Sequence, residues 1–308
     1  MTDNELQVYV NGRFYPAQEA RVSVYSWGFL YGDGVFEGLP VSEGRIFRLH
    51  EHTDRLFASA QAVGIRIPLS WDGFLDAIRQ TVNVNSLEQG YLRPIVTRGT
   101  GPMGLRNIQH IHAPDIVIIP QIEGILSVEQ IAQMQVRAKT VGVRRTPPEC
   151  LDPRVKACNY MNLIMAKLEH LASGADTAII LDTHGFVAEG PADNIFAVRR
   201  GRIYTPPPQN VLNGITRATV MEIAAAESNP VIEANLTLYD LYTAEEVFVT
   251  GSLEGIVPIT EIDGRKVASG RMGELSLHLL ECYRQRARAE GIPVLAAAES
   301  KAASYPST

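Results

Sequence analysis

The chain of 308 residues contains little cysteine, no long apolar run and only five lysines. Cys150, Cys158 and Cys282 form no CxxC pair, and their spacing predicts neither a disulfide framework nor a zinc site. No apolar run approaches the roughly 18 residues of a membrane-spanning helix, so we expect no contact with a membrane. The N-terminal stretch MTDNELQVYV lacks the apolar segment of a secretory signal, which favours a cytoplasmic protein.

Basic stripes are absent as well. The formal net charge is −6, and the positive residues do not gather along the chain, so nucleic acid is not an expected partner. Hydrophobic residues make up 45% of the chain, which is enough for a large buried core. A chain of this length predicts two domains rather than one.

The first 120 residues combine strand and helix patterns. Apolar and polar residues alternate around Asn11-Gly12 in VYVNGRFYP, which indicates a β-hairpin. Helical spacing of apolar residues, with Gly64 as a stop, predicts a helix over 47–64. The other elements expected here are strands at 20–27, 91–98 and 115–120 and a helix at 71–85. These patterns predict a small α/β domain over residues 1–120.

A linker over 121–133 and a larger domain over 134–308 are expected to follow. The larger domain opens with strands near 134–146. Its middle is predicted to hold short strands with turns at His184-Gly185, Arg200-Gly201 and Asp263-Gly264, and helices over 159–172, 214–228 and 271–290. The sequence therefore predicts a two-domain α/β (α+β) fold.

Lys156 differs from the other four lysines in its setting. Lys139 lies in a predicted strand, Lys167 on a helix surface, Lys266 after a hairpin turn and Lys301 in the C-terminal tail. Lys156 instead sits among apolar neighbours at a strand-to-helix junction, where burial of a charged amine is costly. Such a site lowers the pKa of an amine and makes it nucleophilic toward a carbonyl carbon. On local sequence alone, a side chain that extends to solvent explains the pattern at least as well.

Seven stretches resemble, in the same order, motifs of the class IV aminotransferases, which are fold-type IV pyridoxal-phosphate enzymes. They are YGDGVFEG (31–38), RLHEHTDRL (48–56), YLRPIVTRG (91–99), KACNYMNLIMAK (156–167), VAEGPADNIFAV (187–198), LNGITRATV (212–220) and VTGSLEGIVPI (249–259). The resemblance covers roughly residues 8–290 and looks strongest to branched-chain amino-acid aminotransferases, with D-amino-acid aminotransferase as a near relative. It implies a small N-terminal and a larger C-terminal domain with pyridoxal 5′-phosphate bound between them.

By this resemblance, Lys156 is the catalytic residue and holds the cofactor covalently. Glu189 in VAEGPADNIF matches the carboxylate that keeps the pyridine nitrogen protonated, so that the ring can take up electrons. Tyr160 matches a tyrosine that hydrogen-bonds the 3′-oxygen of the cofactor, and Leu212 matches a residue that packs on the ring face. Asn194 is expected to tie its turn together rather than to take part in the chemistry.

The phosphate of the cofactor needs cationic and backbone donors. Arg55 matches the phosphate arginine of the family, and its guanidinium can bind bidentately. The NGIT turn opens a predicted helix, so the N–H groups of Ile215 and Thr216 and the helix dipole favour an anion. Ser252 lies where the family supplies a hydroxyl to the phosphate, and Thr250 is a second candidate donor.

Two arginines are candidates for binding the carboxylate of a substrate. Arg93, with Tyr91, matches substrate-side positions of branched-chain members, whereas Arg98 in VTRG resembles the carboxylate-binding arginine of D-amino-acid members. They are five residues apart, so on an uninterrupted strand they face opposite sides and only one reaches the ligand.

The resemblance also implies a pocket for the substrate side chain. Tyr31 and Phe36 look like its wall, and Leu253 is a further candidate for substrate binding. In the family, part of that wall comes from the neighbouring subunit, which implies a homodimer or a higher homo-oligomer. No metal is expected.

The resemblance implies ping-pong transfer of an amino group from a branched-chain L-amino acid to 2-oxoglutarate. Two departures from many branched-chain members, Leu39-Pro40 after VFEG and the bulky Leu253, leave other substrates open. The alternatives are a transaminase of D-amino acids or (R)-amines, and an aminodeoxychorismate lyase of the same fold, which expels pyruvate and needs no acceptor. The presence of Lys156, Glu189 and Arg55 disfavours a non-catalytic ligand-binding relative.

Overall fold

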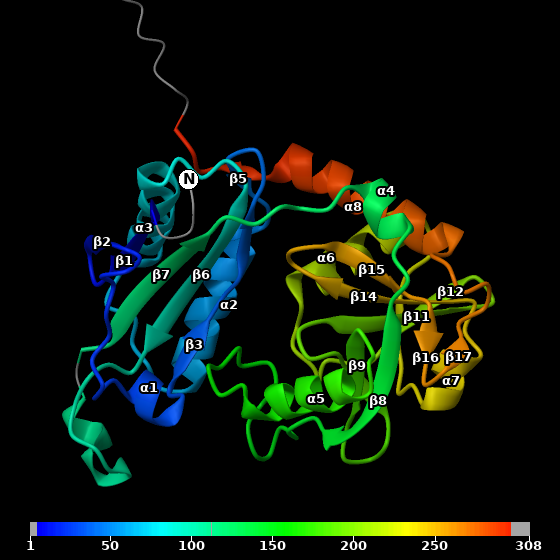
Figure 1. Ribbon diagram of the computed structural model, residues 1–308, viewed down its shortest axis with the longest axis horizontal. Helices are drawn as coiled ribbons and strands as arrows, with labels where there is room; N and C mark the ends of the chain where they lie inside the picture. The colour runs from blue at the N-terminus through cyan, green and yellow to red at the C-terminus, as the bar shows by residue number, and fades with distance from the viewer. Residues whose placement is uncertain (1–4, 112, 297–308) are drawn as a thin grey trace, which may run out of the picture.

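The computed structural model describes residues 5–111 and 113–296, so Lys301 and the rest of the tail lie outside the described residues. Two large sheets occupy the two halves of the molecule, with helices packed against each (Figure 1). Within the described ranges, no helix is both long enough and apolar enough to cross a membrane.

The first sheet has six antiparallel strands in the order β2-β1-β7-β6-β3, and β4 also pairs with β6. They are β1 (Gln7–Val10), β2 (Arg13–Pro16), β3 (Gly34–Phe36), β4 (Leu39–Val41), β6 (Gly90–Thr97) and β7 (Asp115–Gln121). The predicted hairpin at Asn11-Gly12 is confirmed. Both turn residues have positive φ, 49° and 88°, as a tight two-residue hairpin turn requires.

Helices α2 (Leu49–Ala62) and α3 (Trp71–Val84) cover this sheet, and both predicted helices are confirmed. Leu56 and Ile78 from the helices and Leu92 from the sheet are completely buried together. The Oγ of Ser70 accepts the N–H of Gly73 at 3.1 Å and caps α3. Burial of these apolar faces, rather than helix propensity, stabilises both helices.

The strand predicted at 20–27 is wrong. Val22 and Val24 are exposed, and only Ser26 forms an isolated bridge, with Thr100, before the short helix α1 (Trp27–Tyr31) begins. The alternating pattern therefore had no neighbouring strand with which to pair.

The second sheet follows the order β13-β12-β11-β10-β9-β8-β16-β17, while β14 pairs with β11 and β15. Its strands are β8 (Arg137–Arg144), β9 (Thr177–Leu181), β10 (Val187–Glu189), β11 (Asn194–Arg199), β12 (Arg202–Thr205), β13 (Ile232–Glu233), β14 (Glu246–Gly251), β15 (Gly255–Ile259), β16 (Glu261–Ile262) and β17 (Arg265–Lys266). The helical elements not yet named are η2 (Leu105–His110), α4 (Val128–Ala132), α5 (Met161–Ala172), α6 (Ile215–Ala226), α7 (Leu238–Tyr242) and α8 (Glu274–Glu290).

Two segments connect the halves. Residues 121–133, expected to be a linker, contain the last residue of β7 and helix α4, and bury Ile131 in the core with α6 and α8. After α8, strand β18 (Ile292–Pro293) pairs with β5 (Arg45–Ile46), and Val294 is buried in the core of the first sheet. The domain limits at residues 120 and 134 stay a prediction. The C-terminal segment after α8 returns to the first half of the molecule and packs there.

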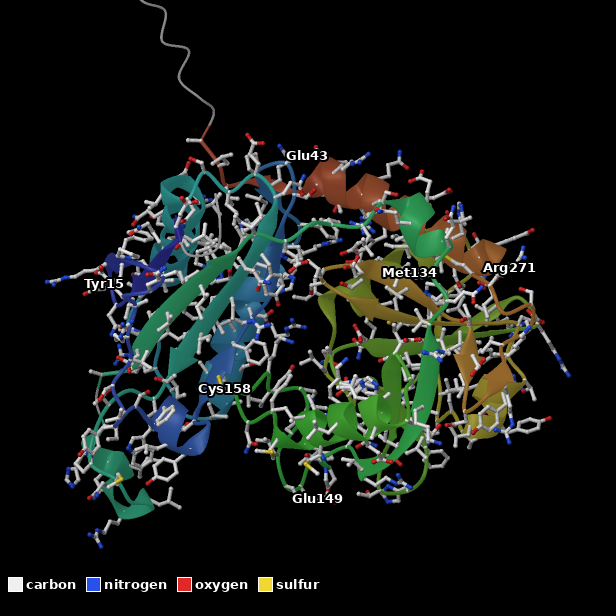
Figure 2. The ribbon with its side chains drawn as sticks, viewed as in Figure 1. Tyr15, Glu43, Met134, Glu149, Cys158 and Arg271 are labelled. Atoms are coloured by element: carbon white, nitrogen blue, oxygen red, sulfur yellow. The ribbon has the colours of Figure 1, made fainter. Side chains whose placement is uncertain are left out.

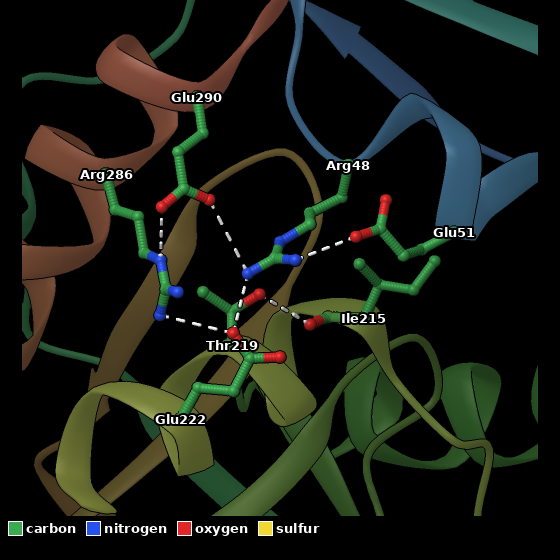
Figure 3. Close-up of polar contacts among 7 residues, drawn as sticks. All are labelled: Arg48, Glu51, Ile215, Thr219, Glu222, Arg286 and Glu290. Atoms are coloured by element: carbon green, nitrogen blue, oxygen red, sulfur yellow. Dashed lines mark hydrogen bonds and ion pairs between the residues drawn. The ribbon is translucent and has the colours of Figure 1, made fainter. Parts of the chain in front are cut away.

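An ion-pair cluster holds a helix of the first half against two helices of the second. Arg48, which immediately precedes α2, contacts Glu51 at 2.7 Å, Glu222 of α6 at 2.6 Å and Glu290 of α8 at 3.6 Å (Figure 3). Arg286 contacts the same Glu222 and Glu290 at 3.2 and 2.8 Å. Because α2 also carries Arg55, this cluster helps to set that arginine relative to the beginning of α6.

Arg48→Met should lower the free energy of unfolding by about 1–2 kcal/mol, because exposed ion pairs each contribute roughly 0.2–1 kcal/mol and three carboxylates share this arginine. The deficit should shrink in high salt, since ions screen surface charges. Urea unfolding at two salt concentrations measures it. Arg79→Met is the matched control, because its partner Asp76 lies on the same helix. A loss no larger than that of the control would contradict a role in joining the halves.

Candidate active site

Lys156 belongs to the second half in sequence, yet its backbone pairs with the first sheet. Its carbonyl accepts the N–H of Phe36 at 3.0 Å, and the N–H of Cys158 donates to the carbonyl of Gly34 at 2.8 Å. Figure 2 shows Cys158 beside β3, on the side that faces the second half. This pairing positions the Lys156 amine between the two sheets, 4.9 Å from the centroid of the Phe36 ring.

The Lys156 amine is withdrawn from water and surrounded by charges of both signs. Desolvation lowers its pKa to about 8, against the opposing effect of Glu37, while Arg55 and Arg93 lower it further. About a tenth of the amine is therefore neutral at pH 7, and the neutral amine is the nucleophilic form.

Glu189, at the end of β10, is 4% exposed and accepts three hydrogen bonds. Arg145 Nε donates to its Oε1 at 2.6 Å, while the Leu212 N–H and Asn194 Nδ2 donate to its Oε2 at 3.0 and 3.3 Å. Burial raises the pKa of the Glu189 carboxyl, and the Arg145 guanidinium counteracts this by favouring the carboxylate. The Asn194 amide also donates to the Leu212 carbonyl at 2.9 Å, so it braces the turn that carries Leu212.

A cavity of roughly 170 Å³ lies among Lys156, Tyr160, Glu189 and Leu212. The Tyr160 ring packs edge-on against Phe36, with ring centroids 5.2 Å apart. Burial raises the pKa of Tyr160 to about 12, so the hydroxyl keeps its proton and can donate a hydrogen bond. One wall of the cavity is thus a hydrogen-bond donor and another is a carboxylate.

A second cavity, of roughly 530 Å³, is lined by Ile215, Thr216, Ser252 and Leu253. The segment from Leu212 to Thr216 separates the two cavities, because Leu212 lines the first and Ile215 the second. Gly214 is required in this segment: a Cβ there would lie 2.0 Å from Asn194 Oδ1. The first N–H groups of α6 have no partner within the helix, as at every helix N-terminus.

Arg55 joins the α2 side of the site to the turn before α6. Its Nε and Nη2 donate to Glu37 at 2.6 and 2.8 Å, and its Nη1 donates to the Asn213 carbonyl at 2.7 Å. His52 contacts the same buried carboxylate at 2.7 Å. Burial alone would raise the pKa of Glu37, but Arg55 and His52 hold that pKa far below its ordinary value. Glu37 therefore anchors a guanidinium whose outer edge reaches the α6 turn.

The two candidate arginines of the substrate side differ completely in their surroundings. Arg93 lies over the rings of Phe36 and Tyr91, 4.6 and 5.4 Å from their centroids, and its buried Nε has no hydrogen-bond partner among the described residues. Gly38 makes room for Tyr91, since a Cβ at Gly38 would lie 1.8 Å from the tyrosine hydroxyl. Arg93 thus has an unsatisfied donor on the same side as Lys156.

Arg98 is occupied elsewhere. It forms a two-point ion pair with Asp33 and donates to the carbonyls of Val63 and Gly64 at 2.8 and 3.1 Å. Tyr31 is also turned away: its hydroxyl accepts the Gly104 N–H at 2.8 Å, and it is not among the described residues that line either cavity.

Sequence reasoning missed Glu37 and Arg145 as parts of the site. Glu37 carried one local signal, a carboxylate directly after the buried stretch Val35-Phe36. Arg145 carried none, because its contact with Glu189 joins residues 44 positions apart.

The profile of the amino-transferase class IV family matches residues 34–262. The chain belongs to the class IV aminotransferases. A candidate branched-chain-amino-acid aminotransferase of Methanocaldococcus jannaschii is 43% identical over 290 residues, which cover 94% of this aminotransferase and 99% of that protein.

Two solved structures of the T.th. branched-chain amino acid aminotransferase are also similar, and each match covers 94% of this chain and 99% of that one. The structure with pyridoxamine 5′-phosphate has a TM-score of 0.89 at 32% identity. The complex with N-(5′-phosphopyridoxyl)-L-glutamate has a TM-score of 0.87 at 31% identity. The predicted fold and the predicted enzyme class are thereby confirmed.

Aminotransferases of this class use pyridoxal phosphate, and the residues present fit that cofactor. Lys156 offers an amine for its aldehyde, Glu189 a carboxylate for its ring nitrogen, and Arg55 with the start of α6 cationic and N–H donors for its phosphate. Thr250 Oγ1, in the strand position paired with Asn194, is buried with no partner among the described residues and supplies one more free hydroxyl.

In the cofactor-free protein, reductive labelling of Lys156 by pyridoxal should rise with pH and level off above about pH 8. The direction follows from its lowered pKa: the amine is protonated and unreactive below that pH and neutral above it. The control is free Nα-acetyl-lysine in the same reaction, whose labelling should keep rising toward the ordinary lysine pKa of about 10.4. Peptide mass spectrometry after borohydride reduction measures both, and identical profiles would refute the shift.

Proposed function

We propose that this aminotransferase moves the amino group of branched-chain L-amino acids to 2-oxoglutarate in a ping-pong cycle. The names of the relatives support the donor, and the glutamate derivative in one T.th. complex supports glutamate and its oxo acid as the second pair. The observation that carries the proposal is Arg93, whose unpartnered donor lies beside the aromatic rings of Phe36 and Tyr91. A cation next to an apolar wall suits a substrate that has both a carboxylate and an aliphatic side chain.

When bound, pyridoxal phosphate supplies an aldehyde that takes up the amino group and a ring that accepts the electron pair released at the α-carbon. Lys156 would hold the cofactor and, once its amine is free, would move the α-proton of the substrate to the carbon that carried the cofactor's aldehyde group. The Glu189 carboxylate, oriented by Arg145, retains a proton on the ring nitrogen. Tyr160 and Leu212 line the same cavity, where the protonated hydroxyl would donate to the ring oxygen and Leu212 would pack on the ring face.

The residues between the two cavities would bind the phosphate of the cofactor. Arg55 has one Nη directed at the α6 turn, where the amides of Ile215 and Thr216 are free for an anion. Ser252 lines the cavity on that side and adds a hydroxyl. Glu37 holds Arg55 in place through two hydrogen bonds.

The substrate carboxylate binds Arg93 rather than Arg98 in this proposal. Arg98 already directs its donors at Asp33 and at two backbone carbonyls, so binding a substrate would leave those groups unpaired. Of the two departures, Leu39 is buried in the core of the first sheet, whereas its neighbour Pro40 and Leu253 both line the second cavity. Neither observation favours a D-amino-acid substrate or a lyase reaction.

We further infer that the enzyme is a homodimer. Helix α5 exposes an apolar stripe of Met161, Ile164, Met165, Leu168 and Leu171. The region around α1 lies next to this stripe. Phe29 of α1 is 71% exposed, and Gly32 lies against Asn159, which stands just before α5. Figure 1 shows α1 and α5 along the same lower side of the molecule. Tyr31, the last residue of α1, is 40% exposed. A cytoplasmic location stays a prediction.

Arg93→Ala should lower kcat/KM for L-leucine by about 10- to 150-fold, because a charged hydrogen bond contributes roughly 1.5–3 kcal/mol and 1.4 kcal/mol is tenfold. Arg98→Ala should mainly lower thermal stability, since it removes the ion pair with Asp33. Steady-state kinetics with paired L- and D-amino acids decides between them. A dominant Arg98 effect together with D-amino-acid preference would overturn the proposal, as would many turnovers per chain without an amino acceptor.

Leu168→Glu should convert the dimer to monomer and reduce activity, because it puts a charge in the middle of the apolar stripe on α5. Tyr239→Glu is the control, since Tyr239 is a similarly exposed apolar side chain on α7. Light scattering coupled to size exclusion, with activity across the eluted peak, measures both. An unchanged mass for Leu168→Glu, or a monomeric parent enzyme, would exclude this face as the interface.

A further inference from the structure

Three metal-binding side chains converge where the end of α6 meets α8. His278 and Cys282 are one helical turn apart on α8, so they project from the same face. Glu227 is the residue that ends α6. Their donor atoms lie close together: His278 Nε2 is 2.7 Å from Glu227 Oε1, Cys282 Sγ is 3.6 Å from that oxygen, and Cys282 Sγ is 3.7 Å from Nε2.

These separations are close to those around a tetrahedral zinc ion. With Zn–S near 2.3 Å and Zn–N or Zn–O near 2.0–2.1 Å, tetrahedral angles place sulfur about 3.5–3.6 Å from nitrogen or oxygen, and nitrogen about 3.3 Å from oxygen. Both sulfur separations already match. Only the His278–Glu227 pair, now joined by a hydrogen bond, must open by roughly half an ångström to admit the ion.

We propose that Glu227, His278 and Cys282 form a zinc-binding site that links the end of α6 to α8. A thiolate, an imidazole and a carboxylate are the ligand types zinc takes, and water completes the fourth position. The hard cations Mg²⁺ and Ca²⁺ prefer all-oxygen ligands and are poor occupants. The imidazole and the carboxylate are half exposed, so an ion can enter from solvent.

The same three residue types also occur in nucleophilic triads, but the geometry here is different. In a triad the carboxylate holds one ring nitrogen of the histidine and the nucleophile contacts the other. Here Glu227 and Cys282 both approach Nε2 of His278. Three donors that point at one position suit a shared ion rather than proton transfer along a chain.

Binding should stabilise the native protein without altering its chemistry. The ligands join two helices that already pack together through Val220 and Leu279 in one core. An ion that binds only the folded chain raises stability in proportion to the logarithm of its concentration over Kd. None of the three ligands lines the two cavities of the candidate active site, as far as the described residues go.

The test is a titration of the cofactor-loaded enzyme with Zn²⁺ in competition with a chromophoric chelator. We expect one ion per chain and a rise in melting temperature. Cys282→Ser and His278→Gln should each weaken binding at least about 10- to 100-fold, because losing even a hydrogen-bond partner of a metal ligand costs that much. Co²⁺ should show tetrahedral ligand-field bands with the parent enzyme and not with Cys282→Ser.

The matched control is His184→Gln, which removes an exposed imidazole outside the cluster and outside both cavities and should leave zinc binding unchanged. Retained transaminase activity in all three variants shows that each is folded. Zinc binding that survives Cys282→Ser, a stoichiometry well below one per chain, or no binding at micromolar Zn²⁺ would each overturn the proposal.

Discussion

The backbone pairing between residues 156–158 and strand β3 is the constraint on which the rest of the site depends. Two hydrogen bonds and the bridge between Val35 and Ala157 fasten a segment of the second half to the first sheet. Without them, the Lys156 amine would have no fixed relation to Phe36 or to Arg93 on the neighbouring strand β6. The reactive amine therefore lies between the halves because backbone groups of both halves hold it there.

Two buried carboxylates make this environment electrostatically stable. Glu37 neutralises Arg55 and contacts His52, while Glu189 accepts from Arg145 and from two further donors. Each charge is paired, so neither carboxylate bears the full cost of burial. Between them the Lys156 amine remains only partly compensated, and desolvation lowers its pKa. The same hydrogen bonds orient the guanidinium groups of Arg55 and Arg145.

Polar contacts between helices extend this organisation beyond the site. The Arg48 cluster ties α2 to α6 and α8, and the end of α6 meets α8 again at Glu227 and His278. These contacts hold the C-terminal part of α6, while Arg55 donates to the Asn213 carbonyl just before its first turn. A rigid helix keeps the amides of that turn in place for an anion.

The sequence by itself determined the helices, most strands and the distinctive setting of Lys156, because apolar periodicity and turn residues act within a few positions. It failed at residues 20–27, where the alternating pattern had no partner strand, and it did not indicate Arg145 or Glu37.

The sequence also left open whether Arg93 or Arg98 faces the site. Only the tertiary structure decided this, because Asp33 and the end of α2 take the donors of Arg98 while Arg93 lies against Phe36. The same holds for Glu227, His278 and Cys282: the i,i+4 spacing of the last two was visible, but the third ligand lies 51 residues away along the chain. Contacts between distant residues depend on how sheets and helices pack, and no local pattern encodes that packing.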